Sequence, residues 1–209
     1  MVLRSILGIW MAAVIAFVFL LPPDPSLGHS AKTIFFHVPM AWISAVAFLV
    51  ALLYGALYLK RKKIEDDIVS SASAGIGFWF CLGATISGSI WAKATWGAYW
   101  NWDPRETSVF ILLLIYGAYF ALRSAVSDEA LRARLAAVYA ILAGTSMPFF
   151  IFAIPRLLPS LHPSPIIARK MEIDITSFAL LLISLAGYTG IYIWLLKIRV
   201  RAEEVLRKG

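Results

Sequence analysis

The sequence predicts an all-α integral membrane protein that crosses the bilayer six times. Of its 209 residues, 61% are hydrophobic and 15% are charged, and the mean hydropathy is +0.80, well outside the range of soluble globular proteins. The apolar residues also gather into segments long enough to cross a hydrocarbon core, which takes about 20 helical residues. The connections between these segments are short. We therefore expect a single membrane domain over residues 1–209, with no appended catalytic domain.

Six segments qualify as spans: residues 5–21, 38–59, 69–92, 107–122, 134–154 and 173–196. The first is short and could be mistaken for the apolar core of a signal peptide. It runs into "LLPPDPSLG" without a cleavage site of small residues, so we interpret it as a span. The third is rich in glycine and serine, which predicts a face that packs closely on another helix. It also holds the single cysteine, Cys81, which excludes a disulfide within the chain.

The distribution of cations predicts the orientation. Six spans place both termini on one side, together with the connections near 60–68 and 123–133. That side carries 13 of the 19 lysines and arginines when they are counted along the sequence. Cationic connections stay in the cytoplasm, so we expect both termini there. The net charge of +7 is then a topology signal and an attraction to anionic lipid, and it does not call for a nucleic-acid partner.

All three histidines lie on the outer side of this topology. His29 is in a polar loop and is most simply a solvated side chain. His37 stands at the mouth of the second span in "IFFHVPMAW", where Pro39 is placed to start the helix, and His162 lies in "SLHPSP" before the last span. Ionisable groups at a membrane boundary are candidates for function. Zinc needs three or four protein ligands, whereas haem iron needs only axial ones, so two imidazoles favour haem over a bare ion.

The stretch "WGAYWNWDPRE" concentrates aromatic surface in one outer segment, residues 91–106. An interfacial belt of tryptophans is one interpretation, but a belt is spread over many helix ends, whereas here Trp91, Trp96, Trp100 and Trp102 lie close together. The spacing of Trp96, Tyr99, Trp100 and Asp103 predicts a short helix with these side chains on one face. Together with the histidine pair, this favours a platform for a flat ligand.

The end of this stretch also has a purely structural explanation. Asp103, Pro104 and Glu106 fit the N-cap, N1 and N3 positions of the fourth span, which is a capping box with proline at its preferred place. Arg105, Lys93 or Arg156 could pair with carboxylates of a ligand, an expectation based on their location alone.

Three segments, "TIFFHVPMAW", "ISGSIWAKATWGAYWNWDPRETS" and "SLHPSP", resemble the signatures of the CcmC family, haem-handling membrane proteins of cytochrome c maturation system I. The pattern WGxxWxWD is shared by a wider superfamily that includes CcsA. The resemblance extends over residues 30 to 196 or so. It implies that haem b is carried as cargo at the outer face, with His37 and His162 as axial ligands. The implied platform consists of Trp96, Gly97, Trp100, Trp102 and Asp103, with Tyr99 where the family often has tryptophan.

The resemblance also implies partners and a location. Haem would pass to a CcmE-type chaperone, in concert with ABC-transporter subunits of the CcmA and CcmB type and a small helical CcmD-type subunit, in the bacterial cytoplasmic membrane. A CcsA-like protein of system II is an alternative, because "WDPRE" looks more like that branch, but its members are longer and have more histidines. An ion or solute transporter is a weaker alternative, since no charged residue lies deep in a predicted span. Nothing resembles a nucleophile–base pair, so we expect a binding and delivery protein and not an enzyme.

Overall fold

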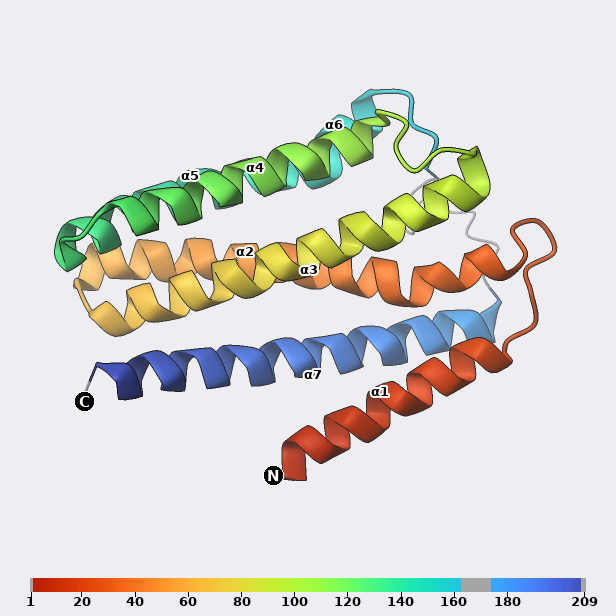
Figure 1. Ribbon diagram of the computed structural model, residues 1–209, viewed down its shortest axis with the longest axis horizontal. Coiled ribbons are helices and arrows are strands. Elements are labelled where there is room, and N and C mark those ends of the chain that lie inside the picture. The colour runs from red at the N-terminus through yellow and green to blue at the C-terminus, as the bar shows by residue number, and fades with distance from the viewer. Residues whose placement is uncertain (1, 163–173, 208–209) are drawn as a thin grey trace.

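The computed structural model describes residues 2–162 and 174–207. Six helices in these ranges are long and apolar enough to span a membrane, which confirms the predicted fold class. No strand occurs within the described ranges. The helices run roughly along one direction (Figure 1). In chain order the elements are α1 (Val2–Leu20), η1 (His29–Thr33), α2 (Ile34–Arg61), α3 (Ile64–Trp96), α4 (Pro104–Ala125), α5 (Glu129–Pro148), the π-helical η2 (Phe149–Ala153), α6 (Ile154–Leu157) and α7 (Ile175–Leu206).

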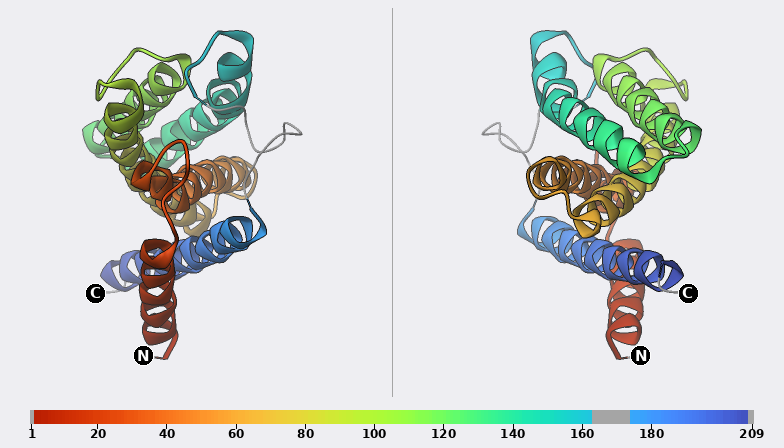
Figure 2. Two further views of the ribbon diagram at one scale, coloured as in Figure 1. Left: turned by 90° about the vertical axis from the view of Figure 1, so that its right-hand side faces the viewer. Right: turned by 90° about the vertical axis from the view of Figure 1, so that its left-hand side faces the viewer.

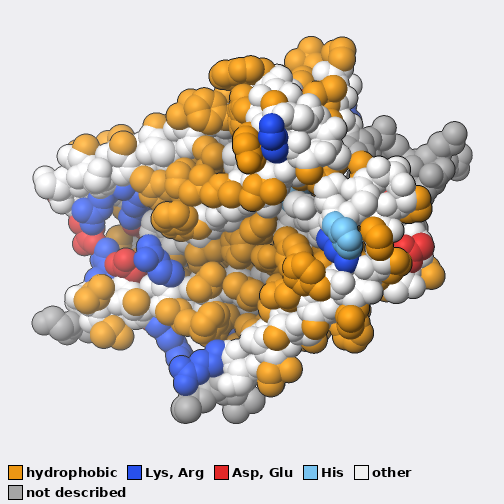
Figure 3. Space-filling model, turned by 45° about the vertical axis from the view of Figure 1, so that its right-hand side comes forward, with side chains coloured by type: hydrophobic (Ala, Val, Ile, Leu, Met, Phe, Trp, Pro, Cys, Tyr) orange, Lys and Arg blue, Asp and Glu red, His pale blue; other side chains and the backbone are white. Residues whose placement is uncertain are grey.

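The connections separate into two groups at opposite ends of the molecule (Figure 1). Residues 21–33, 97–103 and 158–162 lie at one end, which we call the loop end. The tight turns between α2 and α3 and between α4 and α5 lie at the other, which we call the turn end, together with the C-terminus. Apolar side chains cover most of the face seen in Figure 3, as expected for a molecule surrounded by lipid.

α3 begins five residues before the predicted span, because its first turn is acidic and not apolar. Glu65, Asp66 and Asp67 lie in that turn, where carboxylates favourably oppose the positive end of the helix dipole. Asp67 is buried and accepts two hydrogen bonds from the guanidinium of Arg123 in α4, at 2.7 and 2.9 Å. This bidentate pair joins α3 to α4 at the turn end.

The prediction that Pro39 starts the second helix is wrong, because α2 begins at Ile34 and contains Pro39 in its interior. Proline has no N–H to donate to the carbonyl four residues earlier, which is that of Phe35. Ser184 Oγ of α7 donates to Phe35 O instead, at 2.6 Å. The carbonyl that proline leaves free thus connects α7 to α2, and His37 lies in the first turn of a helix that continues past it.

Small residues allow α2 and α3 to pack closely, as the sequence predicted. A Cβ added at Gly77 would lie 2.9 Å from the ring of Phe48, and Ser73 Oγ donates to Ala47 O at 2.7 Å. The ring of Phe48 in turn stacks on Tyr116 of α4, with centroids 3.7 Å apart. These contacts make α2, α3 and α4 a rigid support for the loop end.

α1 lies at the side of the molecule. Val14 and Val18 pack against Leu180 and Leu181 of α7 and against Phe35, while most of the remaining side chains of α1 are exposed. Figure 2 shows α1 crossing α7 on the side away from α4 and α5.

Candidate functional site at the loop end

The tryptophan-rich stretch is not a short helix, so the prediction of one helical face is wrong. α3 extends to Trp96 and ends at Gly97, which has the left-handed φ of 83° that glycine adopts at helix ends. Asp103 precedes Pro104 and has the extended conformation that a residue before proline favours. Only residues 97–103 of the predicted stretch 91–106 therefore lie outside helices, and the stop at Gly97 and the start at Pro104 leave no room for another helix.

The aromatic side chains form two separate pairs instead. Trp91 and Trp96 meet edge to face at the end of α3, with ring centroids 4.9 Å apart. Trp100 and Trp102 meet in the same way at 5.9 Å, and Trp100 also contacts Phe110 of α4. Tyr99 is exposed and lies near the ammonium of Lys93. Each pair presents aromatic surface at the loop end without forming a closed core.

Trp102 combines an exposed ring with an unfavourable backbone. Its φ is 56°, in the left-handed region that costs most non-glycine residues about 1 kcal/mol or more. The carboxylate of Glu106 holds this conformation by accepting hydrogen bonds from the backbone N–H groups of Asn101 and Asp103, at 2.8 and 3.3 Å. The ring is nevertheless 71% exposed. The surrounding contacts therefore fix a large apolar side chain in a position where the protein itself does not bury it.

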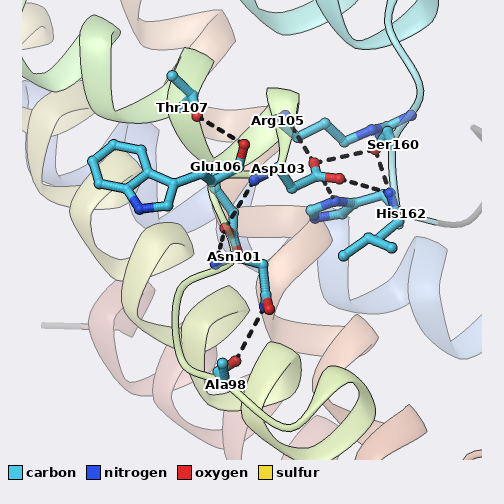
Figure 4. A network of polar contacts seen from close by, with 10 residues as sticks. Ala98, Asn101, Asp103, Arg105, Glu106, Thr107, Ser160 and His162 are labelled. Atoms are coloured by element: carbon cyan, nitrogen blue, oxygen red, sulfur yellow. Dashed lines mark hydrogen bonds and ion pairs between the residues drawn. The ribbon is translucent and has the colours of Figure 1, made fainter.

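The predicted capping box at the start of α4 is confirmed. Asp103 accepts from the N–H of Arg105 at 2.9 Å, Glu106 accepts from the N–H of Asp103, and Pro104 is at N1. The structure adds a second set of contacts that the sequence did not reveal (Figure 4). The same carboxylate accepts from His162 Nδ1 at 2.9 Å, from Ser160 Oγ at 3.1 Å and from the N–H of Leu161 at 2.6 Å.

These contacts set the protonation of Asp103. Burial alone raises the pKa of this carboxyl, but the hydrogen bonds from the N–H groups of Arg105 and Leu161 and from the hydroxyl of Ser160 outweigh that effect, with a further contribution from His162. The pKa of Asp103 therefore lies below its usual range. The group is a carboxylate at neutral pH and can only accept hydrogen bonds.

His162 is neutral in this environment. Burial lowers its pKa to about 4, against the opposing effect of Asp103 and with smaller contributions from the charges of Arg105 and His37. Since a carboxylate only accepts, the proton of the neutral ring lies on Nδ1 and the lone pair on Nε2 is free. The ring also contacts Trp96 edge to face, with centroids 4.8 Å apart, and lies 6.1 Å from Trp91.

His37 is held through the same ring nitrogen by different partners. Its Nδ1 lies 2.9 Å from Ala84 O and 3.2 Å from Ser87 Oγ on α3. A carbonyl oxygen only accepts, so Nδ1 carries the proton here too and Nε2 is free. Gly88 makes this arrangement possible, because a Cβ at that position would lie 2.8 Å from His37 Cε1.

His37 and His162 pack on the same face of α3. Ala84, Gly88 and Trp91 follow each other at helical spacing. His37 packs on the first two and His162 on the third, and Gly88 and Trp91 are separated by a rise of about 5 Å. His29, by contrast, is exposed in η1. The structure thus places His37 against Ala84 and Gly88 of α3 and His162 beside Trp91 and Trp96, whereas no such contact is described for His29.

The side chains gathered here suit a ligand whose metal ion is already coordinated by the ligand's own atoms. Among the described residues, no three side chains of the His, Cys, Asp or Glu type gather as a site for a bare ion. Two imidazoles, each with Nδ1–H donated to a protein acceptor, suit axial ligation of a porphyrin iron through Nε2.

Cations flank this arrangement. Arg105 and Arg156 lie close enough for their charges to repel. Arg156 donates to Phe152 O at 2.9 Å, whereas the buried Nε of Arg105 has no hydrogen-bond partner in the described part of the chain. Lys93 uses one of its three N–H groups in a bond to Gly97 O at 2.8 Å. Of the three cations predicted from location, Arg105 is the one with a buried N–H that has no partner among the described residues.

The fold and this site define a multi-pass helical membrane protein with two free imidazole nitrogens and clustered tryptophans at one end. A family model described as Heme exporter protein C (CcmC) matches residues 1–209. The chain belongs to this family, which confirms the resemblance predicted from the three sequence segments.

Named relatives agree with this assignment. Heme exporter protein C of Bradyrhizobium diazoefficiens is 32% identical over 191 residues, which cover 90% of this chain and 72% of the relative. The protein of the same name from Paracoccus denitrificans is 31% identical over 188 residues, covering 88% and 78%. That of Escherichia coli K12 is 31% identical over 136 residues, covering 64% and 54%.

Proposed function

We propose that the protein binds haem b at its loop end and delivers it for cytochrome c maturation. The observation that carries this proposal is the matched state of His37 and His162: each ring is held through Nδ1 by an acceptor and keeps Nε2 free. Haem supplies an iron with two axial positions outside the porphyrin plane. The two imidazoles occupy these positions, and the relatives named as haem exporters agree with such a cargo.

The aromatic side chains contact the macrocycle. Trp96 lies against His162, so a ring ligated by that histidine is placed beside the end of α3. Trp100, Trp102 and Tyr99 extend this surface along the loop, and Gly97 makes the change of direction that separates the loop from the helix. Flat apolar contacts of this kind provide affinity without fixing a unique orientation.

The propionates of haem are held by arginine. Arg105 brings a buried Nε without a partner, and Arg156 lies near it. A carboxylate between two guanidinium groups relieves their repulsion and forms charge-assisted hydrogen bonds.

The loop end faces the outer side of the bacterial cytoplasmic membrane, in keeping with the excess of cations on the other side of the predicted topology. There haem passes to a periplasmic chaperone of the CcmE type. Subunits of the CcmA, CcmB and CcmD type complete the assembly, a proposal that rests on membership of the CcmC family.

Haem titration of the purified protein tests this function. We expect saturation at one haem per chain with a low-spin spectrum, followed by transfer of haem when an apo-chaperone of the CcmE type is added. Saturation without any transfer would limit the function to binding, and absence of saturable binding would contradict the proposal.

Labelling of introduced cysteines tests the orientation. Sites at Ala94 and Leu158, exposed at the loop end, are expected to react with an impermeant reagent from outside the cell. Sites at Lys63 and Ser127, exposed at the turn end, should react only after the membrane is opened. Cys81 is buried and gives little background. The reverse pattern would invert the topology.

Trp102→Gly distinguishes the contribution of the Trp102 ring to haem binding from the cost of the Trp102 backbone conformation. Glycine adopts a φ of 56° without penalty, and its greater freedom in the unfolded chain offsets part of that gain. We expect the stability of the apoprotein to change by less than about 1 kcal/mol, while haem binding weakens by about 2 kcal/mol because the aromatic contact is lost. Thermal unfolding in detergent and haem titration measure the two effects.

Trp102→Ala is the matched control, since it removes the same ring and keeps the unfavourable backbone. It should lose as much haem affinity as the glycine variant and be less stable. Unchanged haem binding in both variants would show that the Trp102 ring does not contribute to haem binding.

A further inference from the structure

One carboxylate connects two segments that are far apart in the chain. Asp103 lies at the start of α4, and its partners His162, Ser160 and Leu161 lie 57 to 59 residues later. The side chain of Asp103 is 1% exposed, and that of His162 is 18% exposed. Figure 4 shows the carboxylate between the α4 backbone and the imidazole.

Helix capping does not account for this arrangement. The capping function is fulfilled by the bond from the N–H of Arg105, and an N-cap carboxylate performs it equally well when exposed to water. Burying a carboxylate has a free-energy cost that further hydrogen bonds must offset. At Asp103 these further hydrogen bonds all come from residues 160–162. We therefore attribute the burial of Asp103 to its contacts with this segment.

The two histidines differ in the acceptor that each one meets. His162 Nδ1 donates to a carboxylate that also accepts from two backbone N–H groups and a hydroxyl, while His37 Nδ1 meets a neutral backbone carbonyl and a hydroxyl. A histidine that donates to a carboxylate becomes a more basic ligand and is fixed in orientation. The two Nε2 atoms are therefore unequal as donors to a metal.

We propose that Asp103 is a positioning residue that makes His162 the stronger of the two haem-iron ligands and His37 the weaker. The proposal rests on the proposed haem binding and deepens it. The negative charge behind His162 stabilises ferric over ferrous iron, and exchange of ligands during delivery begins at His37, whose acceptor is uncharged.

The test compares Asp103→Asn with Ser160→Ala. Asparagine is nearly as good an N-cap as aspartate. With its single carbonyl oxygen in the place of Oδ1 it can still accept from Arg105 and His162, so it removes the charge opposite His162 and the hydrogen bond from the N–H of Leu161. Ser160→Ala removes two neighbouring hydrogen bonds, from Ser160 Oγ to Asp103 and from the N–H of His162 to Ser160 Oγ, and keeps the carboxylate–imidazole pair. We expect the midpoint potential of the bound haem to shift upward in Asp103→Asn and to stay at the wild-type value in Ser160→Ala.

A second measurement uses the apoprotein and needs no haem. In ¹⁵N-histidine NMR spectra of the wild type, His162 is expected as the Nδ1-protonated tautomer. Asp103→Ser keeps a good N-cap but removes the acceptor of Nδ1–H, so it should lose the dominance of that tautomer. Serine supplies no charge either, so the upward shift of the potential is also expected in Asp103→Ser if the asparagine variant is not recovered folded.

The outcomes separate this inference from the proposed function. A wild-type potential in both Asp103 variants and a wild-type tautomer in Asp103→Ser, with a spectrum that still changes in His162→Ala, would reduce Asp103 to a cap and leave haem ligation standing. An unchanged haem spectrum in His162→Ala would contradict the ligand assignment itself, and this inference would fall with it.

Discussion

Replacing His37 and His162 together by alanine should abolish low-spin haem in the purified protein. Each ring offers a free Nε2, and both rings lie beside the same face of α3. Removing only the hydrogen-bond partner of a metal ligand weakens metal binding 10- to 100-fold. Removing both ligands should therefore weaken haem binding by more than about 100-fold. Haem per chain after purification and the absorbance spectrum after reconstitution measure the effect.

The single variants and one control sharpen this result. His37→Ala and His162→Ala should each alter the spectrum, because one axial position then opens to solvent. His29→Ala should retain wild-type haem content, since His29 is exposed in η1 and no hydrogen bond or ring contact in the described residues joins it to His37, His162 or the tryptophans. A double variant that kept the wild-type low-spin spectrum would rule out this ligand pair.

Gly88→Ala should disturb the site although it removes no ligand. The added Cβ lies 2.8 Å from His37 Cε1 and 3.2 Å from Nδ1, so the ring has to move and its bond to Ala84 O is lost or lengthened. A misplaced ligand is expected to weaken haem binding at least 10-fold, as loss of an orienting contact does. The measurement is the haem titration, together with the spectrum of the reconstituted protein.

Gly75→Ala is the matched control for Gly88→Ala. Gly75 lies in the same helix, and a Cβ there meets no atom within 4 Å. Both variants gain the same helix propensity, about 1 kcal/mol in favour of alanine, so they differ mainly in the contact with His37. Equal haem affinity of the two variants would show that the position of His37 is unimportant.

The six spans were predictable because a lipid environment restricts which sequences can form a membrane-spanning helix. A helix that crosses a bilayer must be apolar for about 20 residues, so hydropathy alone located all six spans. The ends were harder to predict. The acidic first turn of α3 lies outside the apolar run but inside the helix. Pro39 lies inside α2, where the carbonyl of Phe35 that it leaves free accepts from Ser184, 149 residues after Phe35.

The candidate site was predictable in its residues and not in its geometry. The sequence picked out His37, His162 and the tryptophans by type and position. It also predicted a helical tryptophan face, which local signals at Gly97 and Pro104 prevent. The contact of Asp103 with His162 could not be predicted, because the capping box already explained an aspartate at this position. In addition, no local sequence signal indicates a partner 59 residues later.

The axial ligands of the bound haem decide the central claim. Near-infrared magnetic circular dichroism of the ferric protein reads the ligand pair directly, because the energy of its charge-transfer band depends on the two axial donors. We predict the band of bis-histidine ligation in the wild type and its displacement in both His37→Ala and His162→Ala. A wild-type band of any other ligand pair, or one that persists in either variant, would contradict the account.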